Sequence, residues 1–277
     1  MKTLFYLVLF LILPSTSHSQ FNNEKQIEDI KKEGLKLYRS EMASWHGTDL
    51  FTKRYKNTEN IGGYFSYAEN EKNICVFFSK AVNPSVIGTI TFDDLFDIRK
   101  ADVNLTERKF SKTERNLHIL RTKTKEIIAS DTILFKHYNN TKYNVIPLIE
   151  KDINKVYILT GSTLKNIVIF GNDYLLRFNK KNELIDKKSL HKNIIPIEYG
   201  NSKQEEFSVH NHLEETGDFL TPTDVCTLML YGKFTPWQRH LVMSKNYLNF
   251  WMIHDQTYEV MTMDEVEKFM NEPDKEK

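Results

Sequence analysis

The sequence predicts an α/β or α+β protein in which a mixed β-sheet is flanked by helices. Apolar residues recur at helical spacing in residues 23–39 and after two sequences typical of helix N-caps. Short runs rich in β-branched and aromatic residues, each bounded by polar turns, occur between these helices. Only ten Gly and seven Pro occur in the chain, which is typical of a well-packed globular protein.

The N-terminus has the pattern of a secretory signal peptide, residues 1–19. A short basic segment precedes the apolar run Leu4–Leu13, and the small residues of Ser17–Ser19 predict a cleavage site. The apolar run is shorter than the about 20 residues that span a bilayer, so we expect no stable membrane span after cleavage. The pattern therefore predicts an exported protein, periplasmic or secreted.

The chain after residue 19 carries equal numbers of basic and acidic residues. This balance argues against binding to nucleic acid, which needs a basic surface. The length fits one large domain or two small ones. We expect a helix-plus-meander region over residues 20–145 and a second domain over residues 146–277. Cys75 and Cys226 lie in apolar runs, which favours buried free thiols over a disulfide.

The first half is expected to contain two helices and an antiparallel meander. Residues 23–39 form the first helix, with Ile27 and Ile30 on its apolar face. A capping box, Ser111 with Glu114, begins the second helix, which ends near residue 130. The meander between them is expected from strands at residues 63–67, 73–79 and 86–92.

The second half is expected to be rich in strands around one well-capped helix. Thr221 is a candidate N-cap, Pro222 suits the first helical position, and Gly232 is a plausible end. Trp237 and Trp251 are assigned to the core. A short helix is expected over residues 264–270, and strands are expected at residues 155–160, 166–170, 174–178, 194–197, 207–210, 240–244 and 248–253.

One group of residues near the C-terminus has the composition of a metal site. In the strand that ends at His210-Asn211-His212, alternate residues face the same side, so both imidazoles can reach one ion. Asp224 follows in the first turn of the next helix. Two His and one Asp leave a fourth position for water, which is typical of catalytic zinc. A nearby carboxylate would then act as general base.

This order of residues resembles the JAMM (MPN-type) zinc metalloprotease superfamily over roughly residues 155–255. The resemblance implies that His210, His212 and Asp224 bind Zn²⁺ and that Thr221 takes the place of the family's Ser beside the oxyanion. It departs from the family in the number of residues between His212 and Thr221. It also departs at Leu213, where the family has Pro. No Glu stands clearly at the position of the family's catalytic Glu. Asp173 comes nearest, and Glu150, Glu205 and Glu206 are other candidates for the base.

Two interpretations therefore stay open. The first is an exported zinc-dependent hydrolase that acts on peptide or isopeptide bonds of a peptide or protein substrate. The alternative is a non-catalytic secreted or periplasmic binding or envelope-interaction protein that retains the fold. In this interpretation Asp224 only completes the helix cap, and His210 and His212 are ordinary polar residues of a strand edge. His191 and His240 are expected near strand ends, outside the site.

Overall fold

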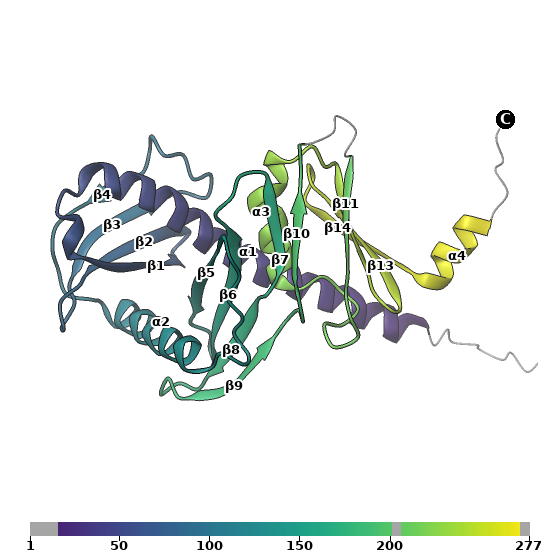
Figure 1. The fold of residues 1–277 in the computed structure, drawn as a ribbon, viewed down its shortest axis with the longest axis horizontal. Helices are drawn as coiled ribbons and strands as arrows, with labels where there is room; N and C mark the ends of the chain where they lie inside the picture. The colour runs from purple at the N-terminus through teal and green to yellow at the C-terminus, as the bar shows by residue number, and fades with distance from the viewer. Residues whose placement is uncertain (1–15, 201–205, 272–277) are drawn as a thin grey trace, which may run out of the picture.

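The computed structural model describes residues 16–200 and 206–271, and within them it shows a mixed α/β protein with four α-helices and four β-sheets. The predicted fold class is confirmed. The long helix α1 (Thr16–Arg54) runs along the molecule, and the sheets follow one another beside it (Figure 1). The apolar run of the predicted signal peptide lies outside the described residues. Among those described, no helix is long and apolar enough to cross a membrane.

Helix α1 is longer at both ends than the 23–39 expected from its periodicity. It continues to Arg54 because residues such as Met42, Ala43 and Phe51 pack into the core. Gly34 allows α1 to approach helix α3 (Pro222–Tyr231) closely, since a Cβ at Gly34 would lie 2.5 Å from Val225 Cγ1. This close crossing holds α1 against the helix that carries Asp224.

The predicted meander is confirmed, and its sheet contains one strand more than the three expected. It forms an antiparallel sheet in chain order, followed by helix α2 (Lys112–Ser130), whose capping box from Ser111 to Glu114 is present. Cys75 and Cys226 are both buried free thiols. A 3-10 turn, η1 (Thr58–Asn60), precedes the sheet, whose strands are β1 (Ile61–Glu69), β2 (Lys72–Ser79), β3 (Val86–Phe92) and β4 (Asp102–Asn104).

The central part of the chain forms two sheets. The expected domain boundary at residues 145 and 146 lies inside β5, a strand that the sequence analysis did not predict. Pro147 is tolerated there because β5 pairs only with β6 and is an edge strand. One sheet contains β5 (Thr141–Leu148), β6 (Asn154–Ser162), β8 (Tyr174–Phe178) and β9 (Leu184–Ser189), and the other pairs β7 (Ile167–Gly171) with β10 (Ile194–Glu198).

The last sheet, which we call sheet D, has the order β11-β12-β13-β14. Strands β11 and β12 are parallel, and helix α3 with the 3-10 turn η2 (Gly232–Phe234) connects them. Trp237 and Trp251 are buried in the core beneath this sheet, as expected. Its strands are β11 (Phe207–Asn211), β12 (Arg239–Met243), β13 (Tyr247–Met252) and β14 (Thr257–Thr262), and helix α4 (Met263–Asn271) follows them.

Candidate metal centre

Strand β11 places two imidazoles on the inner side of sheet D. Its residues are alternately exposed and buried, so His210 points inward. His212 lies just beyond the strand, but its backbone N–H still donates to Met243 O at 2.8 Å, which continues the alternation. Both side chains are buried, with ring centroids 5.0 Å apart. The predicted pairing of His210 with His212 on one face is confirmed.

Asp224 is both a helix cap and a member of the buried cluster. Its Oδ2 accepts hydrogen bonds from the Thr221 backbone N–H at 2.8 Å and from Thr221 Oγ1 at 2.7 Å. Its Oδ1 is buried without a hydrogen-bond partner and lies 3.8 Å from His210 Nε2. The two interpretations of Asp224 are therefore compatible, because Oδ2 serves the cap and also lies 3.3 Å from His212 Nε2, while Oδ1 faces His191 and His210.

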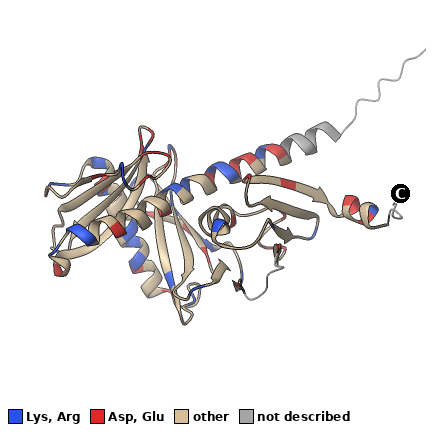
Figure 2. Cartoon of the chain, turned by 90° about the horizontal axis from the view of Figure 1, so that it is seen from above, with Lys and Arg blue, Asp and Glu red and all other residues tan. Residues whose placement is uncertain are grey.

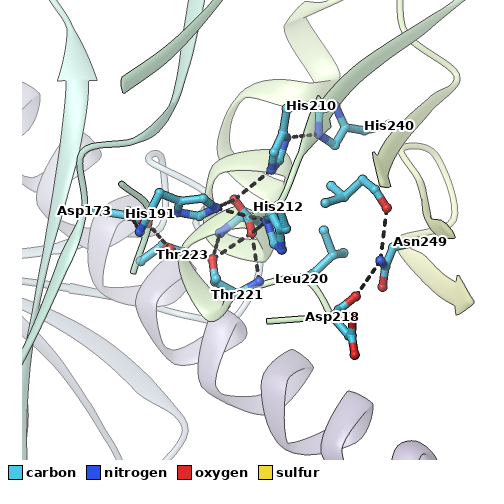
Figure 3. Close-up of polar contacts among 12 residues, drawn as sticks. Asp173, His191, His210, His212, Asp218, Leu220, Thr221, Thr223, His240 and Asn249 are labelled. Carbon is cyan, nitrogen blue, oxygen red and sulfur yellow. Dashed lines mark hydrogen bonds and ion pairs between the residues drawn. The ribbon is translucent and has the colours of Figure 1, made fainter. Parts of the chain in front are cut away.

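A third imidazole, from His191 in the loop after β9, completes the cluster (Figure 3). His191 Nε2 lies 3.0 Å from His212 Nε2 and 3.5 Å from Asp224 Oδ1. Sequence analysis placed His191 near a strand end but outside the site. No local pattern links it to His212, because the two residues meet only through the packing of different sheets.

The cluster is a candidate metal site of three His and one Asp. The ligand atoms all lie within 4.8 Å of one another, and all four residues are buried. Tetrahedral ligands at about 2.0–2.1 Å from a zinc ion would be about 3.3–3.4 Å apart. His191 Nε2 lies 3.0 Å from His212 Nε2, and Asp224 Oδ1 lies 3.5 Å from His191 Nε2 and 3.8 Å from His210 Nε2. The 3.3 Å contact of His212 Nε2 is with the other carboxylate oxygen, Asp224 Oδ2. His210 Nε2 and Asp224 Oδ1 are also buried without hydrogen-bond partners, as expected of atoms that face an ion.

Asp173 lies behind His191, on the side away from the other ligand atoms (Figure 3). His191 Nδ1 lies 2.8 Å from Asp173 Oδ1, and Thr223 Oγ1 donates to Asp173 Oδ2. A carboxylate accepts, so His191 Nδ1 carries a proton, and Nε2 is the ring nitrogen that faces the cluster. Asp173 and Thr221, the predicted catalytic residues, thus contact His191 and Asp224 respectively.

His240, which was expected outside the site, orients His210. Its Nε2 lies 2.8 Å from His210 Nδ1, and its Nδ1 lies 2.6 Å from Ser208 Oγ. Burial lowers the pKa of His240 to about 3 and holds the pKa of His210 well below its ordinary value. Both rings are therefore neutral, and a proton on each Nδ1 leaves His210 Nε2 free to bind an ion.

The charge of the cluster favours a cation. Burial alone would lower the pKa of His191, but Asp173 and Asp224 raise it well above its ordinary value. Burial would raise the pKa of Asp224, but His191 and the other imidazoles hold it well below the ordinary value. One imidazolium between two carboxylates leaves a net negative charge in a buried space. Exchange of that proton for a divalent ion would make the cluster neutral.

The remaining candidates for a general base lie apart from this cluster. Glu150 pairs with Lys36 at 2.6 Å, and Glu206 is exposed at the start of β11. Glu205 lies outside the described residues. A comparison with models of known protein families, with curated proteins and with solved structures found no match. The resemblance to the JAMM superfamily therefore stays a prediction.

Proposed function

We propose that the protein binds one zinc ion in a closed centre with four protein ligands. These are Nε2 of His191, His210 and His212, and Oδ1 of Asp224. The observation that carries the proposal is the convergence of these four buried atoms within 4.8 Å of one another, with Asp224 Oδ1 3.5 Å from His191 Nε2 and 3.8 Å from His210 Nε2. Imidazole and carboxylate ligands in this geometry suit zinc, whereas magnesium and calcium prefer all-oxygen sites.

The zinc would stabilise the fold. Its ligands come from three segments: the loop after β9, the end of β11 and the first turn of α3. The most exposed of the four, His212, has only 6% of its surface accessible. Four protein ligands and a buried site are typical of structural zinc, since catalytic zinc keeps an open position. This supports a non-catalytic protein, and the N-terminal signal pattern supports its export to the periplasm or the medium.

Zinc-dependent hydrolysis of peptide or isopeptide bonds is the second candidate function. It is favoured by the pairing of His191 with Asp173, since a carboxylate that orients an imidazole is the arrangement of a general base. In this case His210, His212 and Asp224 would hold the zinc, which would supply an activated water. His191, oriented by Asp173, would be the residue placed to take up a proton.

The two functions differ in what His191 does, so one variant separates them. We would measure zinc per chain in the purified protein and in His191→Ala, His212→Ala and His254→Ala, the last being an exposed His outside the cluster. One zinc per chain that is lost in both cluster variants and retained in the control supports the four-ligand centre. Full zinc in His191→Ala favours the hydrolase. Absence of zinc from the unmodified protein contradicts both.

A further inference from the structure

Sheet D has an apolar outer face as well as an apolar inner face. The inner residues, such as Val242 and Trp251, belong to the core. The strand register places the alternate residues on the opposite face. Apolar residues dominate this outer face: Phe207 and Val209 of β11, Leu241 and Met243 of β12, Leu248, Phe250 and Met252 of β13, and Met261 of β14.

Within the described residues, no helix or further strand lies across this outer face. Phe207 is 60% exposed, Val209 48% and Met243 43%. None of the face's apolar residues belongs to a hydrophobic core cluster. A sheet that contacts water on one side normally alternates apolar and polar residues, so an apolar second face indicates that another layer covers it.

Helix α4 presents a second apolar surface, half-buried at Met263 and Val266 and exposed at Phe269 and Met270. Met263, Val266, Phe269 and Met270 recur at helical spacing and form one stripe. Phe269 is 75% exposed and Met270 is 77% exposed. The remaining positions of the helix are mostly charged, with Asp264, Glu265 and Glu267 coloured red and Lys268 blue (Figure 2).

The start of α4 is fixed so that the helix points away from its own sheet. It begins directly after β14, without a linker. The Glu265 carboxylate accepts from the Thr262 backbone N–H at 2.7 Å, and the Glu265 N–H donates to Thr262 Oγ1 at 3.2 Å. The helix therefore projects beyond β13 and β14 (Figures 1 and 2). One chain thus carries two apolar surfaces, and both have large exposed side chains.

We propose that two copies of the chain form a symmetric dimer in which α4 of each copy lies on the outer face of sheet D of the other. A nine-residue helix is about 13–14 Å long. The face measures about 17 Å along its strands and about 14 Å between its outermost strands, so the helix fits within it. Arg239 lies on this face, is exposed and has no ion pair with a described residue. Glu267, which flanks the apolar stripe of α4 at helical spacing, can supply its partner, and a two-fold axis makes both contacts equivalent.

Sedimentation of the purified protein over a range of concentrations tests the dimer. Each helix buries only a few apolar side chains, so we expect a dissociation constant of about 1–100 µM. Phe269→Asp and Met270→Asp should weaken association at least about tenfold. Ile133→Asp is the control, because Ile133 is 90% exposed and lies outside both surfaces. A protein that stays monomeric, or a dimer that tolerates both α4 variants, overturns the proposal.

A disulfide trap identifies which copy α4 contacts. Leu241→Cys places a thiol on the sheet face and Phe269→Cys places one on the helix, while the native Cys75 and Cys226 are buried. Oxidation of the double variant should give a chain linked to a second chain on a denaturing gel. A link within one chain would show that α4 folds back over its own sheet, which overturns the proposed dimer. Both tests are independent of the metal centre and of its proposed zinc.

Discussion

His191 connects Asp173 to the buried cluster: its Nδ1 lies 2.8 Å from Asp173 Oδ1, while its Nε2 lies 3.0 Å from His212 Nε2. The carboxylate fixes which nitrogen is protonated and holds the ring in position. In the four-ligand centre, this makes Asp173 the residue that orients a ligand without binding the ion itself.

Asp173→Asn should therefore weaken zinc binding without abolishing it. We expect a loss of about 10–100-fold in affinity, since residues that support metal-bound His have effects of this size. Competition with a chelator of known affinity measures the change. Asp186→Asn is a suitable control, because Asp186 pairs with Arg177 at a partly exposed site away from the cluster. Equal affinity of Asp173→Asn and the unmodified protein would show that Asp173 does not position His191.

Zinc should stabilise the fold when it is added to the metal-free protein. A ligand that binds only the folded state raises the free energy of unfolding by about 4 kcal/mol at a thousandfold excess over its dissociation constant. Urea unfolding with and without zinc measures this difference. His212→Ala should show almost no response, and a response as large as that of the unmodified protein would place the ion elsewhere.

His240→Leu should destabilise the zinc-bound protein. His210 Nδ1 would keep its proton but lose its acceptor in a buried position, which costs about 1–3 kcal/mol. Urea unfolding in excess zinc gives the value. Ser208→Ala, one step further along the chain of hydrogen bonds, should have a smaller effect than His240→Leu. The reverse order would argue against the role assigned to His240.

Gly34→Ala should destabilise the protein although alanine is the better helix former. Its Cβ would lie 2.5 Å from Val225 Cγ1, so α1 and α3 would have to move apart. Overpacking of this kind costs about 1–3 kcal/mol. Gly161→Ala is the matched control, because its nearest contact is an ordinary 3.6 Å. Thermal unfolding compares the two, and equal stabilities would contradict the close crossing.

The pair of Arg108 and Glu114 should make part of the stability depend on pH. Burial alone would raise the pKa of Glu114, but hydrogen bonds from Arg108 and the Ser111 N–H hold it below its ordinary value. Because the folded-state pKa is the lower one, this stability is present above the unfolded pKa. It is lost as the pH falls through the folded-state value. The difference in unfolding free energy between the unmodified protein and Glu114→Gln should shrink on acidification, and a constant difference would contradict this.

Local patterns predicted part of the site well. The alternation of β11 placed His210 and His212 together, and the cap at Thr221 placed Asp224 in the first turn of α3. His191 and His240 were not assigned to the site because they come from separate segments, and only tertiary packing brings them there. With His191 as a ligand, the position predicted for water is filled.

The same distinction holds for the fold: some elements follow from neighbouring residues, and others depend on residues far along the chain. The capping boxes and the meander follow from neighbouring residues, and all are present. The extension of α1 to Arg54 and the strand β5 depend on partners far along the chain. Pro147 lies within β5, and at the edge of a sheet its missing N–H costs no ladder hydrogen bond.

X-ray absorption at the zinc edge of the purified protein tests the four-ligand centre most directly. The account predicts one zinc per chain with four nitrogen or oxygen ligands at about 2.0–2.1 Å and the multiple-scattering signal of three imidazoles. Two imidazoles with an exchangeable water ligand would contradict it and favour the hydrolase. A protein that takes up no zinc would contradict the metal centre itself.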